Sequence, residues 1–184
     1  MNIVNQSFNI IEPNKVRFIT DFKTGTILQT LASICSMRVE VIDTDIEYIS
    51  PNSDIKPGEY TLTKIKKKSK YDKNDTYDIP AFSCNGKIKA FPQWSVTRHP
   101  LNSYLDELIR CKILYEHLLE CNWPKEFARL ILPQSTKIEF IVEGDNLQWI
   151  SFFTCSKHST MYMISLISKL KKQMELQNVD PKSK

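Results

Sequence analysis

The spacing of apolar residues along the chain predicts a mixture of strands and helices. Alternation of apolar and polar residues, which is typical of half-buried strands, occurs at residues 16–22, 38–49, 59–65 and 136–142. Shorter apolar runs flank Asn85-Gly86, a dipeptide that favours a tight hairpin turn. The strand pattern therefore predicts a small sheet.

Four other stretches repeat their apolar residues at helical spacing, at residues 27–35, 101–121, 147–155 and 159–176. The longest of them carries a broad apolar stripe, including Leu105 and Leu108, with charged residues on the opposite side. Thr24 or Thr26 can cap the first helix. Asp145 or Asn146 can cap the third, whose aromatic content predicts burial.

These elements predict an α/β fold of the α+β type, in which a small sheet packs on long helices. The length of 184 residues suits one domain, and 41% hydrophobic residues can form a substantial core. No repeat or linker interrupts the pattern. We expect a single domain over residues 1–177 and a frayed C-terminal tail over residues 178–184.

Composition excludes several classes of protein. Residues 1–6 lack the basic region and apolar core of a secretion signal, and no run reaches the roughly 18 apolar residues of a membrane span. The five cysteines are odd in number and contain no C-x-x-C pair, so neither a disulfide framework nor a metal site is expected. With four glycines, the chain has no glycine-rich phosphate loop. We expect a cytoplasmic protein that does not bind membranes.

Residues 64–75 concentrate lysines in a chain whose net charge is +4. Such a stretch could hold a nucleic-acid backbone, or it could be an ordinary solvated loop with balancing aspartates. Tyr71 alone supplies little surface for base stacking, which favours the ordinary exposed loop. Nucleic acid is therefore not the expected partner.

The sequence Trp-Pro-Lys-Glu-Phe-Ala-Arg-Leu-Ile-Leu-Pro at residues 123–133 carries the main candidate chemistry. Pro124 suits the first turn of a short helix, and Arg129 lies near its end. A guanidinium can bind phosphate with two hydrogen bonds, or it can pair with a glutamate at the helix end. Of the three histidines, His99 and His117 have ordinary surface positions, whereas His158 follows the aromatic helix.

The order of these elements resembles the C-terminal half of the flavin-dependent thymidylate synthase family (ThyX). The likeness lies in the long helix with its Tyr-x-x-Leu-Leu pattern, the Ala-Arg-x-x-Leu-Pro motif, the strand, the aromatic helix and the histidine. The resemblance implies conversion of dUMP to dTMP with FAD, with NADPH and methylenetetrahydrofolate as co-substrates. It also implies a homo-oligomer, a tetramer in that family. By resemblance, Arg129 contacts the dUMP phosphate and His158 lies against the flavin.

Several positions depart from the family pattern. Thr154 stands where the family has a nucleotide-binding arginine, and Trp149 stands where it has an asparagine that contacts the flavin. The Arg-His-Arg signature would fall on Ser33-Ile34-Cys35, so no catalytic residue is assigned. Three functions stay open: a diverged thymidylate synthase, an inactive relative that binds a nucleotide or a protein partner, and a basic nucleic-acid-binding protein.

Overall fold

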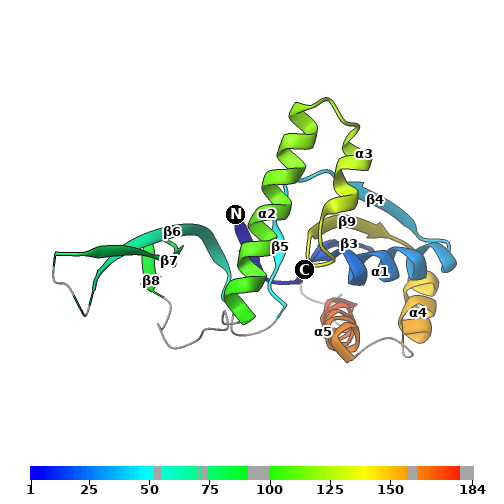
Figure 1. Ribbon diagram of the computed structural model, residues 1–184. Coiled ribbons are helices and arrows are strands. Elements are labelled where there is room, and N and C mark those ends of the chain that lie inside the picture. The colour runs from blue at the N-terminus through cyan, green and yellow to red at the C-terminus, as the bar shows by residue number, and fades with distance from the viewer. Residues whose placement is uncertain (52–54, 70, 72–73, 91–99, 157–160, 179–184) are drawn as a thin grey trace. The chain divides into compact units, whose positions relative to one another are not determined.

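The computed structural model of the protein describes residues 1–51, 55–69, 71, 74–90, 100–156 and 161–178 (Figure 1). The chain divides into two compact units: unit 1 contains residues 1–4 and 46–133, and unit 2 contains residues 5–45 and 134–184. Each unit has its own sheet and its own helices. The mixed α/β class predicted from the sequence is confirmed, although the strands form two sheets. The single domain over residues 1–177 stays a prediction.

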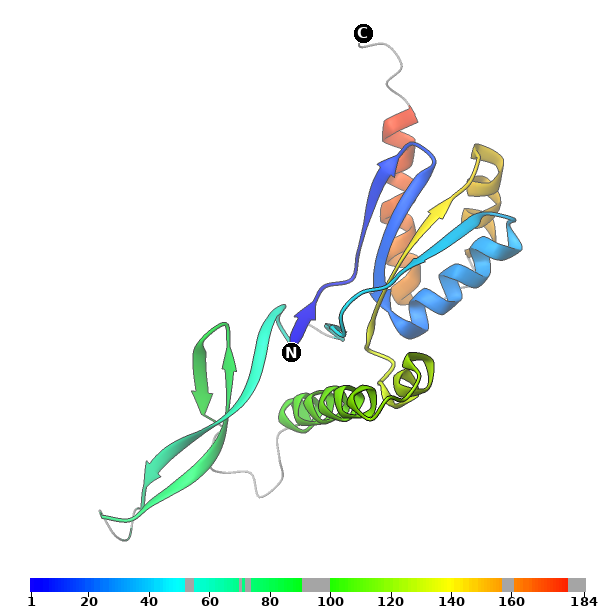
Figure 2. The same cartoon turned by 90° about the horizontal axis from the view of Figure 1, so that it is seen from above.

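The sheet of unit 1 has five strands in the order β5-β1-β6-β7-β8. Their bounds are Asn2–Val4 for β1, Tyr48–Ile49 for β5, Gly58–Lys68 for β6, Thr76–Cys84 for β7 and Lys87–Ala90 for β8. Strands β6 and β7 form a long twisted antiparallel pair (Figure 2).

The predictions on these strands have different outcomes. The hairpin turn at Asn85-Gly86 is confirmed, with φ of 50° and 75°, the left-handed values that a type I′ turn needs. The strand predicted over residues 59–65 is confirmed within β6, but the exposed loop expected after it is wrong at its start, because residues 66–68 continue β6 and pair with residues 76–78 of β7. Lys70 and Lys73 lie outside the described residues.

The helices of unit 1 are α2 (Pro100–Glu120), the short α3 (Lys125–Ala128) and the 3₁₀ turn η1 (Arg129–Ile131). Leu105 and Leu108 of α2 are buried as predicted, whereas Ile113 and Leu119 of the same helix are exposed.

A small apolar core lies beneath α2 in unit 1. It consists of Ile3, Tyr48, Ile55, Tyr60, Leu105 and Leu108. The Tyr48 hydroxyl donates to the Leu108 carbonyl oxygen at 3.0 Å. Burial raises the pKa of Tyr48, and it raises the pKa of Tyr60 to about 12. Both phenols are therefore neutral at ordinary pH.

The sheet of unit 2 has four antiparallel strands in the order β2-β3-β9-β4. Their bounds are Ser7–Glu12 for β2, Lys15–Asp21 for β3, Arg38–Ile42 for β4 and Lys137–Glu143 for β9. The strands predicted at residues 16–22 and 136–142 are confirmed within one residue at each end. The strand predicted over residues 38–49 is wrong as one element, because β4 and β5 belong to different sheets.

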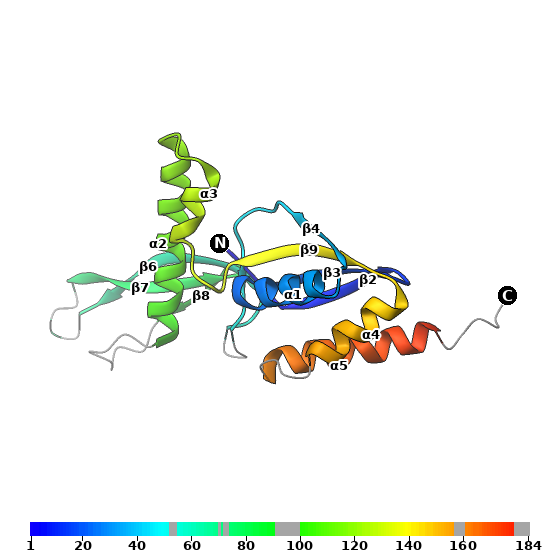
Figure 3. The same ribbon diagram turned by 90° about the vertical axis from the view of Figure 1, so that its right-hand side faces the viewer.

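Helices α1 (Phe22–Ile34), α4 (Asn146–Cys155) and α5 (Met161–Asn178) pack on one face of this sheet (Figure 3). Alternate strand residues point to that face, and they share one core with residues of all three helices: Val16, Phe18, Phe140 and Val142 from the strands and Leu28, Phe152 and Leu170 from the helices. The buried aromatic helix predicted at residues 147–155 is confirmed.

Helix α1 differs from its prediction at both ends. It begins at Phe22 because the Asp21 side chain caps it, accepting a hydrogen bond from the Thr24 amide at 2.9 Å, so neither predicted threonine is the cap. At the other end Ile34, the last residue of α1, is exposed. Gly25 lets α1 approach the sheet closely, since a Cβ there would collide with Ile138.

Replacing Tyr48 by Phe should lower the free energy of unfolding by about 1 kcal/mol. The substitution keeps the ring in the core of unit 1 but leaves the buried Leu108 carbonyl without its hydroxyl donor. Urea unfolding followed by circular dichroism measures the change. Tyr71→Phe is the matched control, because Tyr71 is 100% exposed. Equal stability of the two variants would contradict the role given to Tyr48.

Replacing Trp149 by Asn should destabilise unit 2 by about 3–5 kcal/mol. The substitution restores the residue type that the ThyX resemblance expects, but Trp149 is 2% exposed and its ring belongs to the core. Thermal and urea unfolding of the variant measure the loss. Trp123→Asn is the control, since Trp123 is 53% exposed. A Trp149→Asn variant as stable as the control would show that position 149 is not structural.

Candidate functional site

Arg129 lies in unit 1, where α3 passes into η1. The preceding helix α2 is closed by Asn122, which has a left-handed φ of 60°. Pro124 then precedes the first residue of α3. Ala128 is fully buried and fixes the short helix against its surroundings, whereas Arg129 is exposed. The local fold therefore presents the guanidinium on the surface.

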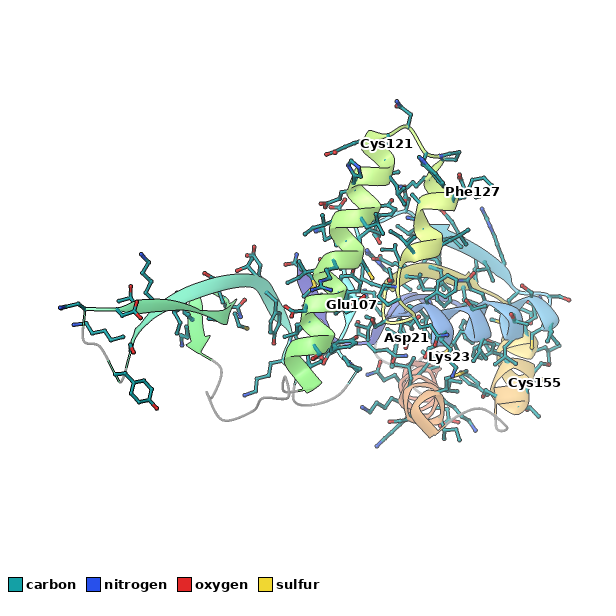
Figure 4. The ribbon with its side chains drawn as sticks, in the orientation of Figure 1. Asp21, Lys23, Glu107, Cys121, Phe127 and Cys155 are labelled. Carbon is teal, nitrogen blue, oxygen red and sulfur yellow. The ribbon has the colours of Figure 1, made fainter. Side chains whose placement is uncertain are left out.

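The surface around Arg129 carries several exposed apolar side chains. Phe127 is 60% exposed and Leu130 is 79% exposed, and Trp123 precedes them (Figure 4). Large apolar groups gathered on a surface often mark a binding site. We call Trp123, Phe127, Arg129 and Leu130 the α3 surface. It combines a cation that can bind phosphate with apolar groups that can cover a ligand or a partner.

The start of α4 in unit 2 is occupied by capping interactions. Asp145 accepts a hydrogen bond from the Gln148 amide at 2.8 Å, and the Gln148 side chain accepts one from the Asp145 amide at 2.8 Å. The Gln148 side chain also donates to the Ser36 carbonyl oxygen at 2.7 Å. The predicted cap at Asp145 is confirmed. The side chains of Asp145 and Gln148 therefore make hydrogen bonds that stabilise the start of α4.

Trp149, at the position of the expected flavin contact, points into the core. Its indole N–H donates to the Asn14 carbonyl oxygen at 3.2 Å. Its ring meets Phe152 edge to face at a centroid distance of 5.4 Å and stacks on Phe153 at 5.7 Å. Thr154, at the position of the expected arginine, is exposed and donates its hydroxyl to the Ile150 carbonyl oxygen at 2.9 Å. Neither residue supplies a cation.

A groove of about 440 Å³ runs between α4 and α5. It is lined by Asn146, Trp149, Ile150, Phe153, Lys171, Met174 and Glu175. Its two charged groups pair with each other, Lys171 Nζ lying 3.7 Å from a Glu175 carboxylate oxygen. A flavin dinucleotide needs cations or backbone donors for its diphosphate. The described residues of α4 and of this groove therefore do not fit the flavin that the resemblance implies.

Of the three histidines, only His117 lies in the part of the chain that the structure describes. His158, expected to lie against the flavin, is outside the described residues, as are Arg98 and His99. His117 is exposed on α2, with Nε2 3.8 Å from the Cys121 sulfur and Nδ1 3.6 Å from a Glu120 oxygen. The roles of Arg129 and His158 thus stay predictions.

The sequence did not indicate a buried carboxylate on the second face of the unit 2 sheet. The Glu139 side chain is buried, accepts a hydrogen bond from Arg17 Nε and lies 3.9 Å from Lys137 Nζ. Alternation along β9 places Lys137 and Glu139 on one face of the sheet. The burial of the Glu139 carboxylate depends on Arg17 of β3, which is far away in the sequence. Because both cations are paired to the carboxylate, the cluster holds the sheet together and offers no ligand site.

Among the described residues, no helix is both long and apolar enough to cross a bilayer. Nor do three or more histidine, cysteine or acidic side chains gather in that part of the chain in a way that could hold a metal ion.

Comparison with known proteins identifies the family. The family model Thy1, described as thymidylate synthase complementing protein, matches residues 52–175. No curated protein matches the chain. The matched stretch contains α2, α3, β9 and α4, and therefore Arg129 and Trp149, whereas residues 33–35, where the Arg-His-Arg signature was expected to fall, precede it. The match confirms the resemblance to ThyX and covers well over half of the 184 residues, so the chain belongs to the Thy1 family of thymidylate synthase complementing proteins.

Proposed function

We propose that the protein is a nucleotide-binding member of the Thy1 family whose ligand is dUMP. The observation that carries this proposal is the exposed Arg129 at the end of α3, inside the stretch that matches the family. A nucleoside monophosphate presents a doubly charged phosphate with three oxygens. A guanidinium can donate two parallel N–H bonds to two of them.

The role of Arg129 is binding and orientation. The buried Ala128 anchors the backbone next to Arg129, so the Arg129 side chain extends from a fixed point of the backbone. If Arg129 holds the phosphate, the pyrimidine ring of the nucleotide has a restricted position. A restricted position reduces the entropy that is lost when a second reactant meets the ring. The exposed side chains of the α3 surface can shield the bound nucleotide from water.

The complete family reaction is the first candidate for the chemistry, and the family match favours it. In that reaction FAD, when bound, carries hydride and methylene to dUMP, with NADPH and methylenetetrahydrofolate as co-substrates.

The second candidate is a relative that binds the nucleotide without methylating it. The burial of Trp149 and the hydrogen bond of Thr154 within its own helix favour this candidate, because the expected ligand positions on α4 have structural roles. We therefore propose nucleotide binding without flavin chemistry at α4. We also propose, from the family, a homo-oligomer that resides in the cytoplasm.

Replacing Arg129 by Ala should weaken dUMP binding by about 1.5–3 kcal/mol, the range for a hydrogen bond to a charged group. Isothermal titration calorimetry measures the affinity, with uridine as a second ligand. Uridine lacks the phosphate, so its affinity should not respond to the substitution. Arg110→Ala is the control, since Arg110 is an exposed arginine on α2 whose nearest carboxylate oxygen, on Glu107, is 4.0 Å away. Equal dUMP affinity in both variants would refute the assignment of Arg129.

If the second candidate is right, the purified protein should be colourless and should take up no FAD, because Trp149 and Thr154 have structural roles in α4. Absorbance between 350 and 500 nm after addition of about 100 μM FAD and gel filtration is the measurement. With dUMP, NADPH and methylenetetrahydrofolate also present, no dTMP should form. A yellow protein that produces dTMP would establish the first candidate and reject the second.

A further inference from the structure

The outer part of the β6–β7 hairpin is a two-stranded ribbon. Strands β6 and β7 pair without a register shift from Tyr60 with Cys84 to Lys68 with Thr76. The third strand, β8, pairs with residues 81–84 of β7. Residues 64–68 and 76–80 therefore extend past β8 as an antiparallel pair (Figure 2).

The register places most lysines of this hairpin on one face. Alternate residues of a strand belong to opposite faces of a sheet, and residues paired across two strands belong to the same face. The face to which Lys66 belongs holds five lysines: Lys64, Lys66, Lys68, Lys87 and Lys89. Asp78, the partner of Lys66, is the one acidic residue among the paired positions of that face. We call these five positions the lysine face.

The lysine face is exposed and carries unbalanced charge. The described side chains of Lys66, Lys68 and Lys87 are all exposed, and none of them forms an ion pair with a carboxylate of the described residues. Residues 58–90 contain eight lysines and four acidic residues, an excess of four charges that equals the net charge of +4 of the whole chain. The positive charge of the protein is therefore concentrated in this hairpin.

We infer that the lysine face binds the phosphate backbone of double-stranded DNA without reading its sequence. Lys64 and Lys68 lie four residues apart on β6, about 13 Å along an extended strand. Over that length a DNA duplex presents roughly eight negative charges, so each lysine of the ribbon can meet a phosphate. Lysine contacts phosphate as a point charge, and phosphate contacts carry no sequence information.

The shape of the hairpin favours a DNA duplex over RNA or a single strand. The major groove of B-form DNA admits a two-stranded β-ribbon, whereas the major groove of an RNA duplex is deep and narrow. Single strands are held largely by stacking on aromatic rings, and Tyr71 is the one aromatic group among the described side chains of residues 64–90. The sequence favoured a solvated loop over nucleic-acid binding, but the pairing of residues 66–68 orders these lysines and changes that conclusion.

Fluorescence anisotropy of the full-length protein with a labelled DNA duplex of mixed sequence tests this inference. The dissociation constant should be about 1–100 μM at physiological salt, and the logarithm of the affinity should fall linearly with the logarithm of the salt concentration. Replacing Lys66 and Lys68 together by Gln should reduce the magnitude of this slope by about 2, one for each lost phosphate contact. Lys169→Gln with Lys172→Gln is the control and should leave the slope unchanged, because it removes the same charge from exposed positions of α5 in unit 2.

A second variant keeps the test decisive if the double variant loses its native circular dichroism. Lys87→Gln changes an exposed residue on a different strand, β8, and should reduce the slope by about 1. A slope that stays the same in the variants of the lysine face would overturn the inference. Tighter binding to a single strand of the same length, or binding to vesicles of anionic lipid but not to the duplex, would also overturn it.

The same variants separate this inference from the proposed nucleotide site. Arg129→Ala should weaken dUMP binding and leave the affinity for the duplex unchanged, whereas the variant at Lys66 and Lys68 should do the reverse. Loss of duplex binding in Arg129→Ala alone would place the DNA at the α3 surface, which contradicts the role given to the lysine face.

Discussion

The position of β9 between β3 and β4 is the constraint on which unit 2 depends. Its Phe140 is fully buried and stacks on Phe18 of β3 at a centroid distance of 5.3 Å, which fixes the face that the helices must cover. Because period-two alternation then aims Ile138 at α1, that helix can approach only with a glycine at position 25. The strand leads directly to the Asp145 cap, so its register also sets where α4 begins.

The same constraint determines the environment of Trp149. Once α4 is fixed by its cap, the Trp149 ring packs in the core of unit 2. Arg129 lies on a separate short element, anchored by Ala128, and can keep a binding role. A shared fold does not require a shared set of ligand contacts. Here the packing of α4 supports the proposal that flavin is not bound at that helix. The exposure of Arg129 supports the proposal that the protein binds a nucleotide.

Local signals in the sequence predicted much of this fold. The turn at Asn85-Gly86, the cap at Asp145 and the alternation of β9 each depend on neighbouring residues. The start of α1 was missed because an aspartate and two threonines compete as caps within six residues. The lysine-rich part of β6 and the burial of Glu139 could not be predicted, since each depends on a partner distant in the sequence, the strand β7 and the side chain of Arg17.

The central claim is that Arg129 receives the phosphate of dUMP, and a crystal structure of the protein with dUMP tests it most directly. The account predicts phosphate density within hydrogen-bonding distance of the Arg129 guanidinium, at the end of α3. A well-ordered nucleotide whose phosphate lies elsewhere, for instance against Lys171 in the groove between α4 and α5, would contradict it.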